Sequence, residues 1–395
     1  MLSFNPHKEN CTACTACASI CPVHCISMHT DEEGFLYPIA STDDCIQCGL
    51  CETVCPSICR IPEETQTHLA FAATSKHQKI WQRSASGGIF SEICLHWGDD
   101  NTWFFGAAWN DLKVCHIGVK GFADLQKLCR SKYIESSLEE VFIEIKHHLD
   151  NNEKVLFCGT PCQVAGLRHF LQKDYPQLLL IDLICHGVGS PYVFETCVKQ
   201  MEQQEKKPIK HYEFRAKRRI HETDYLSKLS FSDHSELYVV DDSYIQLFLK
   251  QHCLRPSCGK NCLYRNANRP GDITIADFKG LTNIFPHLKG EKKNYSSIIS
   301  NNKKGEQVIE SLKRDMDLWE CTTDDIIRFN PLFAKQTWFS DKRDSFFTEY
   351  VASPLETIQK WTHPHIRFKK TFRQKVFDIL PIFVRKLILK LKHNE

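Results

Sequence analysis

The chain has 395 residues, of which 42% are hydrophobic and 25% are charged, and this length allows two or three folded domains. Its formal net charge of +2 at pH 7 gives no reason to expect a nucleic acid partner. The chain contains 21 cysteines, but neither a run of 18 apolar residues nor a basic region followed by an apolar core at its start. We therefore expect a protein of the reducing cytoplasm, whose thiols bind metal rather than form disulfides.

The first predicted domain, residues 1–62, contains two copies of one cysteine motif at an offset of 34 residues. Each copy reads Cys-x-x-Cys-x-x-Cys-x-x-x-Cys-Pro, the spacing of bacterial-type ferredoxins with two 4Fe-4S clusters. Thiolates suit this task because soft sulfur ligands hold iron–sulfur clusters. The last cysteine of each run ligates the other cluster. The predicted ligands are therefore Cys11, Cys14, Cys17 and Cys55 for one cluster, and Cys45, Cys48, Cys51 and Cys21 for the other.

Two other interpretations of these cysteines are a disulfide framework and a pair of zinc sites. The matched runs, each closed by Cys-Pro, favour iron–sulfur clusters over both. Cys25 and Cys59 follow the closing cysteines by four residues, and we expect them to be small buried side chains that bind no iron. Strands at 26–28 and 35–38 and a helix in each half would make this an α+β ferredoxin-like module. The polar residues 62–66 predict a linker.

The next region, residues 70–150, begins with Ser84-Ala85-Ser86-Gly87-Gly88, a pattern that predicts a helix start. Its backbone N–H groups would bind a phosphate, or the segment is an ordinary serine cap with a glycine turn. Strands are predicted at 103–109 and 114–119, and helices at 122–129 and 138–149. Lys132 lies between these helices and either pairs with an anion or is solvated.

From residue 151 onward the pattern becomes α/β. Strands at 154–158 and 178–184 alternate with a helix at 164–171, and a late strand follows at 271–278, so we expect a mainly parallel sheet. Ligands of such sheets bind at the carboxyl ends of the strands. Several chemically active side chains occupy those ends: Cys158, Thr160, Cys162, Cys185 and His186.

A third cysteine cluster, Cys253, Cys258 and Cys262, lies in a loop rich in proline and glycine. Three thiols need a fourth ligand to hold a 4Fe-4S cluster, and Cys162 or Cys185 could supply it from the sheet. A zinc loop and a set of unligated thiols are the other interpretations. The last predicted domain, residues 341–395, ends in a basic amphipathic helical tail at 367–392. This tail would lie on an anionic membrane surface, on the body of the protein or on a partner.

Six motifs after residue 80 occur in a recognisable order: Ser84–Phe90, Ser131–Tyr133, Val155–Gln163, Asp182–Gly187, Arg255–Cys258 and Asp272–Phe278. Together they resemble the beta subunit family of coenzyme F420 hydrogenases and dehydrogenases. The coenzyme is a deazaflavin that carries hydride. The resemblance covers residues 70–340 and divides into an N-terminal part, 70–150, and a C-terminal part, 151–340, of one α/β flavin domain.

The resemblance implies a bound flavin, usually FAD, and an iron–sulfur cluster in the flavin domain. The flavin-binding positions that it implies are Ser86, Gly87, Gly88, Ser131, Lys132, Tyr133, Gly159, Thr160 and Pro161. The implied cluster ligands are Cys258 and Cys262 with Cys162 or Cys185. The chain departs from the family pattern twice, since three residues rather than two separate Cys258 from Cys262, and Lys279 replaces a common tryptophan.

These features predict an iron–sulfur flavoprotein oxidoreductase that exchanges hydride with coenzyme F420 or another organic substrate. His186 would supply a proton, or it makes a structural hydrogen bond. One alternative is an electron-transfer subunit without a substrate of its own, and another is a ferredoxin-dependent reductase of polysaccharide biosynthesis without the coenzyme. The expected partner is a redox protein or a small hydride carrier. The expected location is the cytoplasm, either free or peripheral at the inner face of the membrane.

Overall fold

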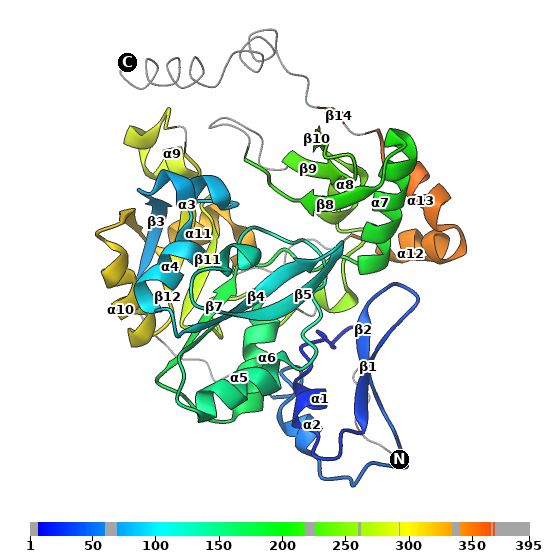
Figure 1. Cartoon of the computed structure of the whole chain (residues 1–395), viewed down its shortest axis with the longest axis horizontal. Helices are drawn as coiled ribbons and strands as arrows, with labels where there is room; N and C mark the ends of the chain where they lie inside the picture. Colours follow the sequence, from blue (N-terminus) through cyan, green and yellow to red (C-terminus); the bar gives the residue numbers. More distant parts are fainter. Residues whose placement is uncertain are drawn as a thin grey trace.

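The structure is a computed structural model that describes residues 7–59, 69–217, 226–259, 262–291, 293–333, 340–364 and 366–367. An eight-stranded sheet with helices on both faces forms the body of the molecule (Figure 1). A four-stranded sheet and a small N-terminal module lie beside it. The predicted linker at 62–66 falls outside the described residues, and so does the predicted basic tail beyond Arg367.

The N-terminal module, residues 7–59, contains two short helices and one hairpin. The elements are α1 (Ala16–Ile20), β1 (Ile26–Thr30), β2 (Leu36–Ala40) and α2 (Leu50–Thr53). The strands pair antiparallel across a turn at Gly34, whose φ of 90° favours glycine. Helices α1 and α2 begin 34 residues apart, which is the offset of the cysteine runs. The internal repeat therefore extends from the sequence to the backbone.

The eight-stranded sheet has the order β13-β3-β12-β11-β7-β6-β4-β5. Its strands are β3 (Ala70–Ser75), β4 (Trp103–Asn110), β5 (Lys113–Lys120), β6 (Val155–Gly159), β7 (Leu178–Leu183), β11 (Ile273–Asp277), β12 (Ser296–Ser300) and β13 (Met316–Cys321). The pairs β4–β6, β6–β7 and β7–β11 are parallel, whereas the other four pairs are antiparallel. The sheet is therefore mixed rather than mainly parallel, partly because β4 and β5 form a hairpin that forces opposite directions.

Alternating side chains cover both faces of this sheet. Phe104 and Leu156 pack under α4 (Ile89–Trp97) and α10 (Lys303–Leu312) on one face. Their sequence neighbours Phe105 and Phe157 pack against α5 (Val141–Asp150) and α6 (Pro161–Leu171) on the other. This second core also contains Cys14, Ala16 and Val54 of the N-terminal module. The module is therefore seated on the α6 side of the sheet (Figure 1).

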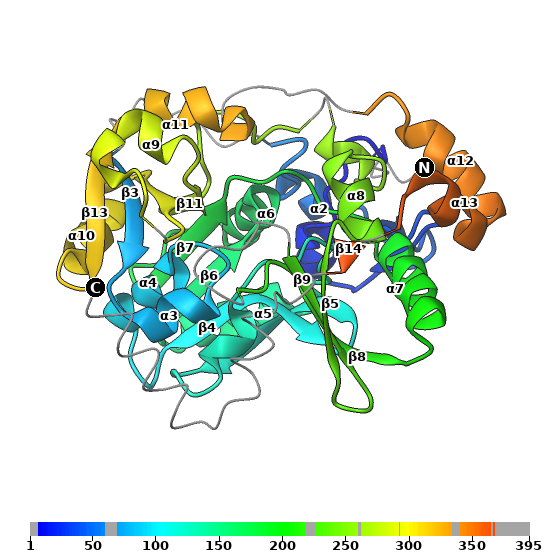
Figure 2. The same cartoon turned by 90° about the horizontal axis from the view of Figure 1, so that it is seen from above.

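The smaller sheet has the order β14-β10-β9-β8 and is antiparallel throughout. Its strands are β8 (Ile209–Glu213), β9 (Leu226–Phe231), β10 (Glu236–Val240) and β14 (Ile366–Arg367). Four helices join its core: α7 (Pro191–Glu205), α8 (Ser243–Leu249), α12 (Arg343–Ala352) and α13 (Pro354–Trp361). The last two helices lie against α7 (Figure 2), so the first part of the predicted C-terminal region belongs to a folded core.

The remaining helices are short. They are α3 (Gln78–Arg83), α9 (Leu281–Ile284), α11 (Thr323–Phe329) and the 3-10 helices η1 (Leu125–Leu128), η2 (Pro256–Cys258), η3 (Pro286–Leu288) and η4 (Pro331–Phe333). The predicted helix at 122–129 is thus the single turn η1. Strands β3, β4, β6, β7 and β11 run in one direction, because β3 and β11 are both antiparallel to β12. Their carboxyl ends share one edge of the sheet, where ligands of α/β proteins bind.

Candidate metal centres

The first predicted ligand set lines a single cavity inside the module, which we call the inner cavity. Its thiols belong to Cys11, Cys14, Cys17 and Cys55. All four residues are buried. Two come from the first cysteine run before α1, one lies within α1, and the fourth closes the second run. The structure therefore brings together the four cysteines that the ferredoxin spacing groups.

The second predicted set lines another cavity of the module, which we call the outer cavity. Its thiols belong to Cys21, Cys45, Cys48 and Cys51, and Cys25 lies beside them. Cys48 is exposed and Cys45 and Cys51 are partly exposed, in contrast to the inner set. Two sites of similar ligand geometry therefore differ in their access to solvent.

The backbone around both cavities has the same unusual shape. Ala13 and Thr15 have left-handed φ angles of 54° and 62°, and the residues 34 positions later, Gln47 and Gly49, have φ angles of 56° and 74°. Alternating right- and left-handed residues turn successive N–H groups toward one side and form concavities that bind anions, including iron–sulfur clusters. Non-glycine residues adopt this conformation at a cost. The strained turns therefore fit an anionic cluster in each half.

The structure also separates the alternatives for these cysteines. All 21 cysteines are free thiols, which excludes the disulfide framework. Nowhere in the described ranges do three His, Cys, Asp or Glu side chains gather around the position of one metal ion. Zinc and a 4Fe-4S cluster both accept four thiolates, so the ferredoxin spacing of the two runs is what favours the cluster here.

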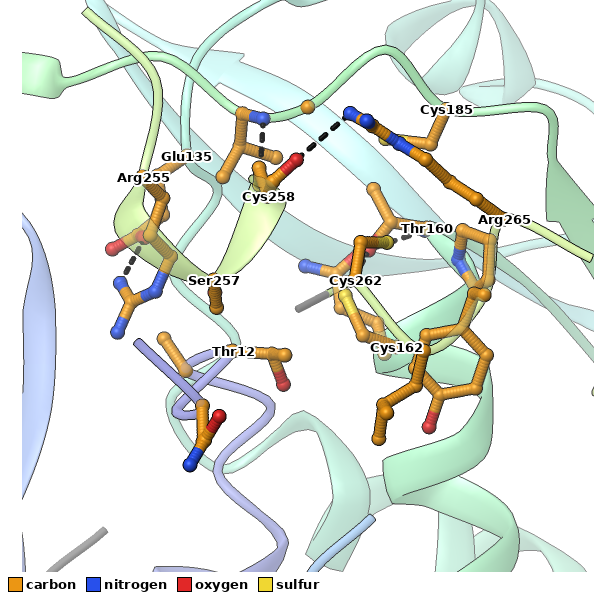
Figure 3. A pocket seen from close by; sticks show the side chains of 18 of the residues that line it. Thr12, Glu135, Thr160, Cys162, Cys185, Arg255, Ser257, Cys258, Cys262 and Arg265 are labelled. Atoms are coloured by element: carbon orange, nitrogen blue, oxygen red, sulfur yellow. Dashed lines mark hydrogen bonds and ion pairs between the residues drawn. The ribbon is translucent and has the colours of Figure 1, made fainter. Parts of the chain in front are cut away.

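A third cavity lies between the module and the carboxyl edge of the sheet, and we call it the interdomain cavity. Four cysteines line it: Cys162, Cys185, Cys258 and Cys262. Cys162 is in the first turn of α6 after β6, and Cys185 follows β7, so the adjacent parallel strands place them together. Cys258 ends η2, and its loop lies over the edge of the sheet (Figure 3).

Hydrogen-bonding groups and burial both act on these thiols. The backbone N–H of Val188 donates to Sγ of Cys258 at 3.4 Å, and Oγ1 of Thr160 lies 3.1 Å from Sγ of Cys162. Burial raises the pKa of Cys162 to about 11 and that of Cys185 to about 12. Neutral thiols therefore prevail there at pH 7 unless a cation displaces their protons.

The structure assigns different places to the remaining cysteines. Cys253 lies in the aromatic core around α7 and α8 and does not line the interdomain cavity. The sequence leaves open whether Cys162 or Cys185 joins the loop cysteines, and both do. Cys25 is buried with its sulfur 3.4 Å from that of Cys21, whereas Cys59 points its sulfur at the carbonyl of Glu52 at 3.6 Å. Equivalent positions of the repeat thus differ.

A buried ion pair joins the module to the interdomain cavity. The guanidinium of Arg255 pairs with Glu135 and donates to the carbonyls of Cys11 at 2.8 Å and Leu36 at 2.7 Å (Figure 3). It also lies 4.2 Å from the ring centre of Tyr37. Glu135 accepts from the N–H of Leu36 at 2.9 Å. Burial raises the pKa of the Glu135 carboxyl, and the neighbouring guanidinium opposes that shift.

The inner and interdomain cavities adjoin each other. Thr12 and Ala13 line both of them. Burial raises the pKa of Tyr264, and negative charge on the nearby sulfurs of Cys162, Cys262, Cys14 and Cys55 would raise it further. Gly166 of α6 faces the module so closely that a Cβ there would lie 2.7 Å from that of Cys14. Sequence reasoning missed Glu135, Gly166 and Tyr264, since their roles depend on this contact between domains.

The first group of predicted flavin positions is tied to neighbouring strands. Oγ of Ser86 donates to the carbonyl of Tyr295 at 3.0 Å, and the N–H of Gly87 donates to Oγ of Ser296 at 2.9 Å. Gly88 is the N-cap of α4 with a φ of 93° and makes no side-chain cap. Ser86 is therefore not the helix cap that the sequence suggested, and only part of this turn presents free backbone groups.

The other predicted flavin positions lie nearby on the carboxyl edge. Nζ of Lys132 donates to the carbonyl of Cys129 at 2.8 Å, and burial lowers the pKa of this ammonium to about 8. Oγ of Ser91 in α4 lies 3.4 Å from Sγ of Cys129, so the α4 and Lys132 segments are in contact. Ser131 belongs to the same loop, and the ring of Tyr133 stacks on that of Phe248 with 4.8 Å between the ring centres.

The turn after β6 caps the N-terminus of helix α6. Thr160 and Gln163 form a capping box on α6, with Pro161 in the first turn, and Gly159 ends the strand. His186 points toward Phe248, whose carbonyl lies 3.3 Å from its Nε2. Burial lowers the pKa of His186 to about 4, so the ring is neutral at pH 7. This arrangement favours a structural hydrogen bond over a charged proton donor.

Comparison with known families completes this description. Residues 152–325 match the family model for the C terminus of the coenzyme F420 hydrogenase/dehydrogenase beta subunit. The model of the 4Fe-4S dicluster domain matches residues 10–59. Both findings confirm the resemblance that the sequence motifs predicted, and they identify the N-terminal module as an iron–sulfur domain joined to a beta-subunit-type region.

Among solved structures, the chain is similar to a chain of the F420-reducing NiFe hydrogenase complex from Methanosarcina barkeri. The similarity has 14% sequence identity and a TM-score of 0.44, and it covers 76% of this chain and 94% of that chain. No curated protein matches the chain. Across the described ranges, none of the helices has the length and apolar character needed to span a bilayer.

Proposed function

We propose that the chain is an electron-transfer subunit with three 4Fe-4S sites. Cys11, Cys14, Cys17 and Cys55 would hold the inner cluster, and Cys45, Cys48, Cys51 and Cys21 the outer cluster. Cys162, Cys185, Cys258 and Cys262 would hold the third. The observation that carries this proposal is that the third set of four thiols lines a cavity that shares Thr12 and Ala13 with the inner cavity.

When bound, such clusters supply one-electron transfer at potentials tuned by hydrogen bonds and by solvent access. The chain itself contributes the three thiol sets, the inward N–H groups of the left-handed turns and the N–H of Val188. It also excludes water from the inner set by burying all four cysteines. The Arg255–Glu135 pair fixes the module beside the interdomain cavity.

The first test counts iron and inorganic sulfide in protein purified or reconstituted without oxygen. Three clusters would give about twelve irons per chain. The double variant Cys258→Ala/Cys262→Ala should lose about four irons, because it removes half of one ligand set. The matched control Cys253→Ala changes a buried cysteine five residues before the first of them and should lose none. A count of about eight irons in the unsubstituted protein would refute the third site.

A flavin on the carboxyl edge is the second part of the proposal, and the family match of residues 152–325 and one structural observation support it. Three segments meet there: the start of α4, the loop with Lys132 and the turn after β6. Ser91 of α4 contacts Cys129 of the loop. The Cys158 sulfur at the end of β6 is close enough to Lys132 to influence the pKa of its ammonium. When bound, FAD would supply the exchange between hydride and single electrons. Lys132 would hold negative charge beside it. Ser86, Gly87 and Thr160 already make hydrogen bonds within the protein, so we assign these groups a structural role.

An anaerobic visible spectrum tests this part separately. Flavin absorption after incubation with FAD, followed by bleaching with reduced coenzyme F420, would support hydride exchange with the deazaflavin. Bleaching with dithionite alone would retain the flavin and point to another organic substrate, as in the polysaccharide-reductase alternative. If iron is present and no flavin is retained, the chain is an electron carrier without an organic substrate of its own.

A further inference from the structure

The cysteines of the outer cavity are closer to the surface of the module than those of the inner cavity. Cys48 is exposed there, and Cys45 and Cys51 are partly exposed, while each thiol of the inner set is buried. Electron transfer between proteins requires a redox centre close to a surface that a partner can reach. The outer cavity is therefore the site that a partner protein could reach, whereas the inner cavity adjoins the interdomain cavity that Cys162 lines.

Exposed apolar side chains lie at this cavity. Val23 and Ile46 line the outer cavity and are 40% and 60% exposed. Of the nine large hydrophobic side chains that are exposed in the described part of the chain, four belong to the module, and two of the four line the outer cavity. Such concentrations mark interaction sites, whereas single exposed apolar residues are ordinary.

The charge of the module is strongly acidic. Between His7 and Cys59 the sequence has seven Asp and Glu residues against one lysine, although the whole chain has a net charge of +2. That lysine, Lys8, is itself paired with Asp31 at 2.7 Å and Glu32 at 3.2 Å. Asp43 and Asp44 are exposed directly before Cys45. Negative charge therefore accompanies the exposed apolar side chains of the outer cavity.

We propose that this outer face, formed by Val23, Asp43, Asp44 and Ile46, docks a one-electron carrier protein whose redox centre has a basic rim. The proposal rests on the proposed function, since it needs a cluster in the outer cavity. Apolar contact at the centre and opposite charge at the rim is the usual composition of a protein interface. Complementary charge mainly raises the rate of encounter. In the docked complex one electron passes from the reduced site to the oxidised carrier, and no atom is transferred.

The charge pattern distinguishes this partner from other occupants. A small anionic redox molecule would be repelled by Asp43 and Asp44, and so would an anionic membrane surface. A basic protein gains from the same carboxylates, and this gain falls as salt screens exposed charges over about 10 Å at 0.1 M. The association should therefore depend on ionic strength and on the two aspartates together.

The test uses the full chain, reconstituted without oxygen, reduced and freed of excess dithionite. Mitochondrial cytochrome c serves as a basic haem probe, and ferricyanide as a small anionic one. In stopped flow, the variant Asp43→Lys/Asp44→Asn should reduce cytochrome c about tenfold more slowly at low salt. The amide at position 44 keeps an acceptor for Oγ of Ser41, which now bonds Asp44 at 2.7 Å. The same variant should react faster with ferricyanide, because the repulsion is relieved.

The control variant Asp324→Lys/Glu356→Gln changes net charge equally at exposed positions of α11 and α13. It should leave both rates within about twofold of the unsubstituted protein. Val23→Ser tests the apolar part and should slow cytochrome c reduction at low and high salt alike, since the change carries no charge. At high salt the effect of the aspartate variant should shrink while that of Val23→Ser persists.

Electron paramagnetic resonance of the reduced protein before mixing distinguishes failure of the proposed function from failure of the docking face. Absence of 4Fe-4S signals from the unsubstituted protein would overturn the proposed function. If the signals are intact in every variant but the aspartate variant and the control have equal rates, the docking face is refuted and the function stands. Slowing of both probes by the aspartate variant would indicate damage to the outer cluster and would also refute the electrostatic role.

Discussion

Arg255 shows at the residue scale how one side chain joins two parts of the molecule. Its fully buried guanidinium pairs with the Glu135 carboxylate and donates hydrogen bonds to two backbone carbonyls of the module. These carbonyls belong to Cys11 and to Leu36 of the hairpin. Burying an ion pair carries a desolvation penalty, and such pairs are tolerated when further hydrogen bonds satisfy both partners. The ring of Tyr37 and the N–H of Leu36 complete that set here.

Removing one partner should therefore be far more harmful than removing both. Arg255→Met leaves the Glu135 carboxylate buried without its cation and should lower the free energy of unfolding by about 3–5 kcal/mol. The double variant Arg255→Met/Glu135→Gln should recover much of that loss, because no charge remains. Anaerobic urea unfolding of the iron-loaded protein measures both. Equal losses in the single and double variants would contradict this account of the pair.

Cys25 and Cys59 allow a second prediction at the same scale. The Cys25 thiol is placed to donate to Sγ of Cys21 at 3.4 Å, and such a bond stabilises a thiolate ligand most when the cluster is reduced. Cys25→Ala should therefore lower the reduction potential of one cluster by about 30 mV, roughly a threefold change in its redox equilibrium. Cys59→Ala should shift neither module cluster, since that thiol contacts the carbonyl of Glu52. Redox titration with resonance detection distinguishes the two.

At the scale of elements, helix α6 combines a cap, a ligand position and a contact. Thr160 and Gln163 begin it, Cys162 lies in its first turn, and Gly166 faces the module. Glycine inside a helix costs about 1 kcal/mol relative to alanine. Its presence is explained by the Cys14 side chain, whose Sγ lies 2.9 Å from where a Cβ would stand.

Gly166→Ala should accordingly displace Cys14 despite improving the helix. We expect a lower yield of the inner cluster on reconstitution, with the outer and third clusters retained, so that iron falls by up to about four per chain. The control Ala165→Gly on the same helix weakens α6 without approaching the module. If iron loss is the same in both variants, general weakening of α6 would explain it instead.

Strand β5 contains a buried histidine, His116, that makes the folded protein less stable in acid. Burial lowers the pKa of His116 to about 4, and its Nδ1 contacts Oγ of Ser136 at 2.8 Å. The folded protein therefore binds fewer protons than the unfolded chain, whose histidine titrates near 6.5. Stability contributed by the neutral ring is present above pH 6.5 and is lost as the pH falls toward 4. The loss at this one group should approach about 3 kcal/mol.

His116→Gln should remove this part of the acid sensitivity. The difference in melting temperature between the variant and the unsubstituted protein should narrow from pH 7.5 to pH 4.5. Circular dichroism follows the melting while absorbance reports iron loss. Parallel curves over that range would show that another group dominates acid unfolding.

At the scale of the whole molecule, two buried arginines attach the module to the body. Arg255 bonds its hairpin, and Arg343 at the start of α12 pairs with Glu33 while donating to the carbonyl of Leu254 at 2.6 Å. Buried pairs are screened by salt much less than exposed ones. The radius of gyration from X-ray scattering should therefore change by less than about 1 Å between 0.05 and 1 M salt. Expansion at high salt would mean that exposed charges hold the module.

The sequence was most informative where chemistry fixes local spacing. The two cysteine runs predicted which four thiols share each module cavity, and hydrophobic runs predicted β4, β5, β6, β7 and β11. Spacing cannot show which distant residues complete a set. It therefore left Cys162 and Cys185 as alternatives and included Cys253, which the aromatic core around α8 buries instead.

The mixed sheet was missed for a similar reason. Strands β12 and β13 were not predicted, and their direction depends on pairing with β3, more than 200 residues away in the chain. Glu135 and Gly166 carry no local pattern of function either, because one is an acid before a helix and the other a glycine inside one. Their significance arises only from the module that packs against them.

The two cysteine sets of the module differ in their access to reagents. Cys11, Cys14, Cys17 and Cys55 are buried, whereas Cys48 is exposed. In the folded chain a thiol-modifying reagent should therefore reach Cys48 before it reaches any cysteine of the inner set.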